Sequence, residues 1–197
     1  MAHNTAKREI DIEFLYLDLE VCDQCKGSES NLDEALRELS KVLKKTGVRV
    51  NVKKIHVESL EQAQSLNFIS SSTTRIDGRD AAIEVKENYC SSCGTLSGNE
   101  TYCRVWNFQG EEYSTIPKSL VVEAILKEIY GAGRDAKKTK PEQIARSLEN
   151  LKRFFDGREN RHKVTAEPIT TATEKTVNAA QTVQTTNAAS SAGCGCS

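Results

Sequence analysis

The sequence predicts an α/β fold, in which a mixed sheet is flanked by helices and followed by a C-terminal helix and a disordered tail. Three observations support this. An apolar, strand-like run is followed by an amphipathic helix and then by an alternating strand. An Asp77-Gly78 pair marks a hairpin turn, and a last apolar helix follows Pro117. With 197 residues, the chain can bury one core without needing disulfide bridges.

The first half of the predicted sheet comes from a strand–helix–strand unit. Residues 10–21 are expected to form a strand whose middle is apolar on both faces, as in a central strand. An amphipathic helix is expected at 31–46, with Ser30 or Asn31 as its N-cap. Residues 48–57 alternate and give the second strand. The two strands should be parallel, with a right-handed crossover.

Shorter segments make up the second half of the core. Ser59 followed by Gln62 is a capping box for a short helix that reaches Leu66. The Asp77-Gly78 turn should join two antiparallel strands, because both positions tolerate positive φ. In order, the other elements are strands at 73–76, 81–85 and 102–108, and a helix opened by Pro117 with Leu120, Val121, Ala124, Ile125 and Ile129 inside.

The chain divides into four zones. Residues 1–9 are a polar leader, and residues 10–131 carry nearly all strand and helix signals. Residues 132–163 are a charged helical extension, in which a helix at 141–156 should dock through an apolar face of Ile144, Leu148, Leu151 and Phe155. Residues 164–197 lack aromatics and are rich in Thr, Ala, Gln, Asn and Ser, so we expect a disordered tail.

Charge and hydropathy narrow the classes of function. The formal net charge is −1, and acidic residues are interleaved with the basic ones, so we expect no nucleic-acid partner. No apolar run has the length of a membrane span, and the N-terminus lacks the apolar core of a secretory signal. We therefore expect a cytoplasmic protein. There, seven cysteines are more typical of metal ligands or redox groups than of structural bridges.

Two Cys-X-X-Cys pairs are the main candidates for chemistry: Cys22 with Cys25 in "CDQC", and Cys90 with Cys93 in "CSSC". With the strand that ends in "CDQC", the helix after it and the segment "FISSSTTRIDGRD", residues 10–131 resemble the thioredoxin-like superfamily. The likeness is greatest to an uncharacterised family with a second Cys-X-X-Cys and a "CRVW" strand. The resemblance implies a thiol-disulfide oxidoreductase in which Cys22 attacks and Cys25 resolves the mixed disulfide.

The sequence departs from the thioredoxin pattern at two places. Thioredoxins carry a cis-proline just before the third strand, and Ser72 stands at the matching position here. Because a cis bond without proline costs about 3 kcal/mol, we expect a trans peptide there. Asp23 and Gln24 replace the Gly-Pro inside the motif; the Asp23 carboxylate should oppose formation of the thiolate, and Lys26 should favour it.

The predicted topology brings the distant cysteines to one end of the sheet. Cys22 and Cys25 follow the first strand, and the hairpin should return the chain so that Cys90 and Cys93 emerge at the same end. Cys103 begins the next strand there; it either joins the cluster or is a small buried apolar residue. The four thiols of the two pairs suit a thiol-disulfide relay with protein partners, which we take as the leading hypothesis.

The alternative is a non-enzymatic binding module. Cys22, Cys25, Cys90 and Cys93 would then hold tetrahedral zinc, an iron–sulfur cluster, or a soft ion such as As(III) or Hg(II); a purely structural zinc is a third possibility. Cys194 and Cys196, in the terminal "CGCS", are predicted to be accessory thiols that shuttle electrons or a bound metalloid. The redox hypothesis itself requires no cofactor.

Overall fold

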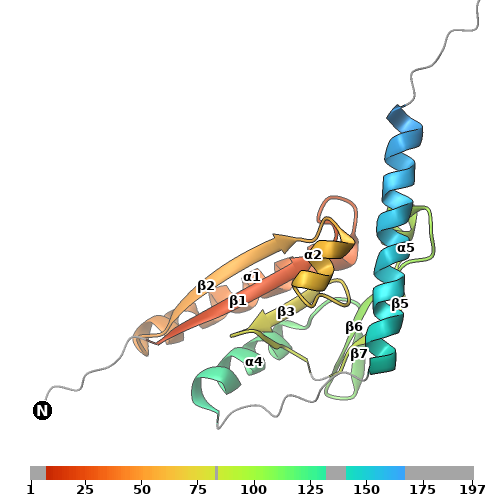
Figure 1. Ribbon diagram of the computed structural model, residues 1–197. Helices are drawn as coiled ribbons and strands as arrows, with labels where there is room; N and C mark the ends of the chain where they lie inside the picture. The colour runs from red at the N-terminus through yellow and green to blue at the C-terminus, as the bar shows by residue number, and fades with distance from the viewer. Residues whose placement is uncertain (1–7, 83, 132–140, 167–197) are drawn as a thin grey trace, which may run out of the picture. The chain divides into compact units, whose positions relative to one another are not determined.

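The structure is a computed structural model that describes residues 8–82, 84–131 and 141–166 (Figure 1). Residues 1–7 of the predicted leader and the tail from 167 onward, with Cys194 and Cys196, lie outside the described residues. The described part contains two sheets and five helices. These are β1 (Glu9–Tyr16), α1 (Asp23–Lys45), β2 (Arg49–His56), α2 (Leu60–Ser65), β3 (Thr73–Ile76), β4 (Arg79–Asp80), β5 (Lys86–Tyr89), α3 (Ser91–Ser97), β6 (Tyr102–Phe108), β7 (Glu111–Tyr113), α4 (Lys118–Tyr130) and α5 (Pro141–Ala166).

The larger sheet has the strand order β2-β1-β3-β4. β1 and β2 are parallel, in register from Glu9 opposite Arg49 to Tyr16 opposite His56, and α1 connects them. β3 is antiparallel to β1 and to β4. Asp77 and Gly78, which form the turn between β3 and β4, both have positive φ. The predicted mixed sheet, parallel pair and hairpin turn are thus confirmed.

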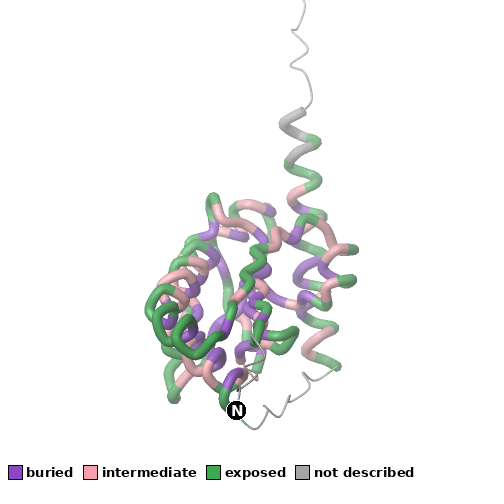
Figure 2. Tube along the Cα trace, turned by 90° about the vertical axis from the view of Figure 1, so that its left-hand side faces the viewer, coloured by how far each residue is buried: buried purple, intermediate pink, exposed green. Residues whose placement is uncertain are grey.

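The central position of β1 follows from its composition. Ile10, Ile12, Phe14 and Leu15 have no exposed surface, so the strand is covered on both faces (Figure 2). Helices α1 and α4 pack together and contribute to one core cluster with β1. The helix predicted after Pro117 is confirmed as α4, with Pro117 as its N-cap; its buried residues are the predicted Leu120, Val121, Ala124, Ile125 and Ile129.

Two predicted boundaries at the cysteine end are wrong. β1 ends at Tyr16 rather than at residue 21, because Asp18 Oδ1 accepts hydrogen bonds from the backbone N–H groups of Glu20, Val21 and Cys22 and folds the chain into a turn. α1 begins at Asp23, eight residues before the predicted start. Its first two turns lack an apolar stripe because the buried residues there are Cys25 and Ser28, and the Ser28 hydroxyl accepts a hydrogen bond from Ile116 N.

The return strand predicted at 81–85 is also wrong. The strand that pairs with β3 is β4, only two residues long, and Ala81 and Ala82 already lie in a bend. The physical reason is the Asp80 carboxylate, which accepts from Ala82 N and forms an ion pair with Arg104 of β6. These contacts turn the chain out of the first sheet and into a second one.

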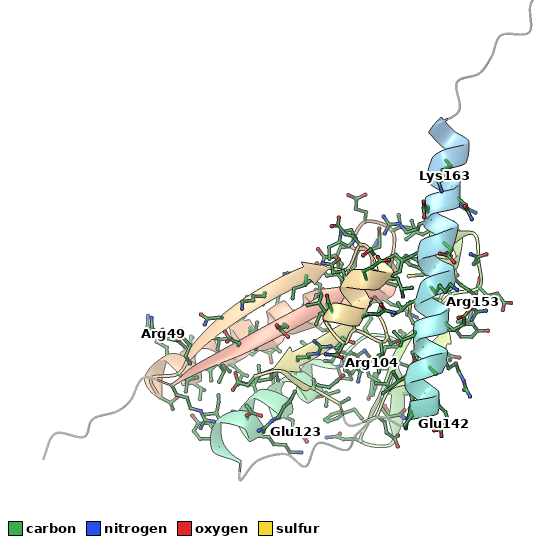
Figure 3. All side chains as sticks on the ribbon, in the orientation of Figure 1. Arg49, Arg104, Glu123, Glu142, Arg153 and Lys163 are labelled. Carbon is green, nitrogen blue, oxygen red and sulfur yellow. The ribbon has the colours of Figure 1, made fainter. Side chains whose placement is uncertain are left out.

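The second sheet has the order β5-β6-β7 and is antiparallel throughout. Arg104 of β6, labelled in Figure 3, links it to the first sheet. Its backbone N–H donates to Ser71 O, just before β3, and its guanidinium group stacks on the Trp106 ring. Helix α5 packs against α3 (Figure 1). The extension helix is therefore confirmed, but it is longer than predicted and buries Ser147, Asn150, Leu151 and Phe154, whereas Phe155 is only half-buried.

None of the described helices combines the length and the apolar character that a membrane crossing requires.

Candidate thiol and metal centre

Cys22 and Cys25 occupy the start of α1. Cys22 is the N-cap residue, with extended backbone, and its Sγ accepts a hydrogen bond from Cys25 N at 3.4 Å. The positive end of the α1 dipole therefore faces Cys22, which favours negative charge on its sulfur. Cys25, one turn inside the helix, has its Sγ 3.2 Å from the Ser71 hydroxyl. Neither side chain is exposed to solvent.

Cys90 and Cys93 repeat this arrangement at α3. Cys90 is again the N-cap, extended as Cys22 is, and its backbone N–H donates to Thr101 O at 2.8 Å. Cys93 lies in the first turn of α3 and is buried. Cys103 projects from β6, where it pairs with Asn88 of β5. The β5–β6 hairpin and α3 thus fix the positions of three thiols relative to one another.

Four of these sulfurs form a compact group. The Sγ atoms of Cys22, Cys90, Cys93 and Cys103 all lie within 4.8 Å of one another. Cys22 and Cys90 are 4.0 Å apart, and Cys93 and Cys103 are 3.4 Å apart. No more than 2% of any of these residues is exposed. We call this group the four-sulfur cluster; it joins the start of α1, the start of α3 and the start of β6.

This set differs by one residue from the set of metal ligands predicted from the sequence. Cys22, Cys90 and Cys93 are brought together as expected, and Cys103 completes the group in place of Cys25. Cys25 belongs to the same buried apolar cluster, but its sulfur faces Ser71. His56 lies apart from this group on β2, where its ring contacts Leu17 O and stacks on Tyr16.

The free thiols are not equivalent electrostatically. Interaction with Cys103, and then with Cys22 and Cys93, holds the pKa of Cys90 far below its ordinary value. The pKa of Cys103 is raised well above the ordinary value, first by Cys22 and then by Cys90 and Cys93. Cys103 favours the Cys22 thiolate, but Cys90, Cys93 and burial outweigh this and raise the pKa of Cys22 to about 12. In the absence of a cation, these shifts favour negative charge on Cys90 over Cys22 and Cys103.

Cys25 stays protonated more firmly. Its neighbour Cys22 and, next, burial raise the pKa of Cys25. Asp23 and Lys26, predicted to act on these thiols in opposite directions, form an ion pair with each other at 2.8 Å. Their charges offset one another at the surface, because both side chains are substantially exposed.

The trans peptide expected at Ser72 is wrong: the Ser71–Ser72 bond is cis. Ser71 is held from several sides by buried groups. Its hydroxyl accepts from Leu17 N at 3.1 Å and contacts Cys25 Sγ, while its carbonyl accepts from Arg104 N at 2.6 Å. The general preference for trans is overridden here by these tertiary contacts, which the local sequence does not reveal.

Sulfur positions of this kind suit a single tetrahedral ion. Zinc lies about 2.3 Å from each cysteine sulfur, which places neighbouring sulfurs about 3.8 Å apart. The Cys93–Cys103 and Cys22–Cys90 separations, 3.4 and 4.0 Å, lie on either side of this value, and every other pair lies within 4.8 Å. An iron–sulfur cluster inserts several atoms between opposite cysteines and needs a wider opening than 4.8 Å. One ion with four thiolate ligands is therefore the arrangement that the residues fit.

Sequence reasoning missed α3 and the contacts made by Asp18 and Ser71. Gly98, which has left-handed φ at the end of α3, was the signal for that helix. Asp18, four residues before Cys22, is typical of a carboxylate that caps a turn. Ser71 offered no local signal, because its role depends on Cys25 and Arg104, both distant in sequence.

Comparison with known proteins gives one family. A family described as a domain of unknown function (DUF2703) matches residues 10–125, which is more than half of the chain and covers all five cysteines of the centre. No curated protein and no solved structure gave a significant match. By the extent of that match, the chain belongs to the DUF2703 family.

Proposed function

We propose that this protein is a metal-binding module that holds one thiophilic ion, zinc first of all, through Cys22, Cys90, Cys93 and Cys103. The observation that carries the proposal is the convergence of four buried sulfurs within 4.8 Å of one another. They come from three separate elements, so their meeting is a product of the fold. Four thiolates at tetrahedral spacing are the ligand set typical of closed zinc sites.

Burial separates this proposal from catalysis on a bound ion. A catalytic zinc keeps one position open to water or substrate, whereas all four positions here are filled by cysteine and closed to solvent. Bound zinc would replace the protons that the cluster otherwise retains, and the N–H of Cys25 would continue to donate to Cys22 Sγ. The role of the protein chain is to hold the ion and exclude water.

Soft ions are the rivals of zinc at this site. Hg(II) and As(III) bind thiolates more strongly than oxygen ligands and are satisfied by fewer than four of them. They would use a subset of the same sulfurs, with the Cys93–Cys103 pair the closest together. The relative affinities of the site for zinc and for these soft ions therefore distinguish a structural zinc site from one that sequesters Hg(II) or As(III).

A thiol-disulfide redox function, with thiol or disulfide proteins as partners, is the second candidate. The strand order β2-β1-β3-β4, the parallel β1–β2 pair joined by α1, and Cys22-X-X-Cys25 at the start of α1 favour it, because they agree with a thioredoxin-like domain. The burial of Cys22 argues against it, since a protein disulfide must reach the attacking sulfur. Either function suits the reducing cytoplasm.

The test is a metal and thiol count on full-length protein purified under anaerobic conditions without chelator. We expect one zinc per chain by mass spectrometry, with Cys22, Cys90, Cys93 and Cys103 protected from alkylation until a chelator is added. A metal-free protein that cannot be loaded with zinc, cadmium or As(III), and that forms a readily reversible Cys22–Cys25 disulfide, would overturn the metal proposal in favour of the redox one.

Cys194 and Cys196 remain proposed accessory thiols. Two thiols one glycine apart can take up a soft ion and pass it on by ligand exchange. Truncation after Thr186 should leave the zinc affinity of the four-sulfur cluster unchanged and slow its loading from a dilute zinc source. Equal loading rates for the truncated and full-length chains would remove this role.

A further inference from the structure

We propose that Cys25 makes the metal site releasable by oxidation: a disulfide between Cys22 and Cys25 withdraws one of the four ligands and frees the ion. This inference rests on the proposed metal function and adds its regulation. The observation behind it is the presence of five buried thiols around a site that needs four. Cys25, the fifth, is beside the ligand Cys22 without belonging to the group.

The two Cys-X-X-Cys pairs differ in how their sulfurs are used. Cys90 and Cys93 both belong to the four-sulfur cluster, so in the loaded protein each would be bound to the ion. Cys22 also belongs to it, but Cys25 Sγ has the Ser71 hydroxyl as its partner at 3.2 Å. Cys25 is therefore the one thiol of the five that stays free to react when the ion is bound.

Cys25 is also well placed to react with Cys22. The two residues bracket the first turn of α1, and Cys25 N already donates to Cys22 Sγ at 3.4 Å. A Cys-X-X-Cys at a helix start has the short separation that a disulfide requires. Moving Cys25 Sγ from Ser71 toward Cys22 breaks one hydrogen bond, and the disulfide then removes only the bond between Cys22 and the ion. The competing pair of Cys93 and Cys103 would instead remove two ligands at once.

Access for an oxidant comes through the turn before α1. Cys22 itself is buried, but Val21 next to it is 44% exposed. One carboxylate, that of Asp18, accepts the N–H groups of Glu20, Val21 and Cys22. A short surface turn held by the Asp18 carboxylate and by one exposed contact from Lys26 Nζ to Glu20 O at 3.5 Å opens locally more easily than a core strand. A small oxidant such as hydrogen peroxide can then reach Cys22.

The chemistry balances with hydrogen peroxide as the oxidant. The Cys22 thiolate attacks one peroxide oxygen as its bond to the ion breaks. The O–O bond breaks, and Cys22 becomes a sulfenic acid while hydroxide leaves and takes up a proton from solvent to form water. The sulfur of Cys25 then attacks the sulfenic sulfur; the S–S bond forms and its thiol proton leaves with the hydroxyl as a second water. Two thiol groups are oxidised, one peroxide is reduced, and the ion loses one ligand.

The experiment uses the full chain with Cys194→Ser and Cys196→Ser, so that tail thiols cannot interfere. The zinc-loaded protein is treated with hydrogen peroxide while a chromogenic chelator reports free zinc, and the disulfide is mapped by peptide mass spectrometry. We expect one zinc released per Cys22–Cys25 disulfide, with rebinding after a dithiol reductant is added. Cys25→Ser should bind zinc normally and release it about tenfold more slowly, because the sulfenic acid then lacks its resolving thiol.

Failure of this inference is distinguishable from failure of the proposed function. If zinc does not bind before peroxide is added, the proposed function fails. If zinc binds, two results contradict the proposed redox release. One is a disulfide mapped to Cys93 and Cys103, and the other is zinc release from Cys25→Ser at the same rate as from the protein that retains Cys25. Should Cys25→Ser not fold, Cys25→Ala and the disulfide map of the unsubstituted pair decide the question.

Discussion

The molecule builds the same local motif twice, in two different settings. In both, a strand or turn leads to a cysteine at a helix N-cap, and the second cysteine lies buried in the first turn. The first motif starts the 23-residue α1, which packs against α4 and the larger sheet. The second starts the seven-residue α3. An α-helix of two turns is not stable alone, so α3 depends on its neighbours.

These neighbours of α3 are β6 and α5. Ser97 and Asn99 at the end of α3 meet α5, where Asn99 Nδ2 donates to Arg153 O. Asn150 of α5 binds both the N–H and the carbonyl of Tyr102, next to Cys103. The second motif, although weaker locally, supplies both of its thiols to the four-sulfur cluster, whereas the first supplies one. Metal binding should therefore be most sensitive to changes in and around α3.

The largest expected effect comes from substituting one cysteine in each motif. Cys93→Ser removes a ligand and should raise the zinc dissociation constant by more than about 100-fold, since even loss of an outer partner of a metal ligand costs 10–100-fold. Cys25→Ser should change it less than about threefold, because the sulfur of Cys25 lies outside the group of four. Competition titration against a chelator of known affinity measures both. Equal losses in the two variants would abolish the difference between the motifs.

A second comparison uses one glycine beside each motif. A Cβ on Gly157 of α5 would lie 2.1 Å from Ser97 O, so Gly157→Ala forces α5 away from α3. We expect it to destabilise the fold by about 3 kcal/mol and to weaken zinc binding. A Cβ on Gly27 of α1 would lie 2.7 Å from the Thr115 side-chain methyl group, whose shift costs less than a shift of backbone, and Gly27→Ala should therefore destabilise the fold less than Gly157→Ala does.

Urea unfolding followed by Trp106 fluorescence measures the two stabilities. Lys152→Ala, on the exposed face of α5, is the matched control and should stay within about 0.5 kcal/mol of the unsubstituted protein. If Gly27→Ala proves as damaging as Gly157→Ala, the α1 motif is as dependent on its surroundings as the α3 motif.

The same contrast explains what could be predicted from the sequence. Periodicity was sufficient for β2, where apolar residues alternate, and for α4, where they recur at helical spacing. It was insufficient for the start of α1, where Ser28 is buried through a hydrogen bond from Ile116, 88 residues away. The prediction of the return strand was wrong for a similar reason, because the Asp80 carboxylate forms an ion pair with Arg104, which belongs to the other sheet. The hydrophobic pattern of a short segment does not reveal polar partners that are this distant in the sequence.

The candidate site was likewise predictable only in part. Chain topology was enough to predict that Cys22, Cys90 and Cys93 meet. Cys22 comes after β1, Cys90 comes after β5, and Cys93 lies in the helix turn next to Cys90. Whether Cys25 or Cys103 would be the fourth member depended on side-chain direction. Cys25 turns toward Ser71, and the inward face of β6 carries Cys103 to Cys93. Those directions are set by packing between sheets, which the sequence alone does not fix.

A smaller effect is expected at the contact between α5 and β6. Asn150 is 2% exposed, and Asn150→Ala would leave the N–H and carbonyl of Tyr102 without their partner. Loss of buried hydrogen bonds of this kind costs about 1–3 kcal/mol. Glu149→Ala, on the adjacent exposed position, is the control and should be near neutral. A stability unchanged in Asn150→Ala would show that α5 does not support β6 through this side chain.

The smallest effect concerns Glu87 of β5, whose Oε2 accepts a hydrogen bond from Ser147 of α5 at 2.8 Å. Burial raises the pKa of this carboxyl group in the folded protein, and the Ser147 hydrogen bond opposes the rise only in part. A raised acid pKa means that the folded state binds the proton more tightly than the unfolded state. Stability should therefore fall as the pH rises from the ordinary carboxyl pKa through the raised one, and stay lower above it.

Glu87→Gln removes this titration while keeping an oxygen that can accept from Ser147. We expect the variant to be slightly more stable than the unsubstituted protein at neutral pH and about equal to it at acidic pH below the ordinary carboxyl pKa. Chemical unfolding at a series of pH values, with the metal removed so that only the protein titrates, measures the difference. A Glu87→Gln protein that is less stable at neutral pH would mean that the charged carboxylate supports the α5 contact. The α3 motif would then owe part of its position to that charge, because α5 is the helix that holds α3 in place.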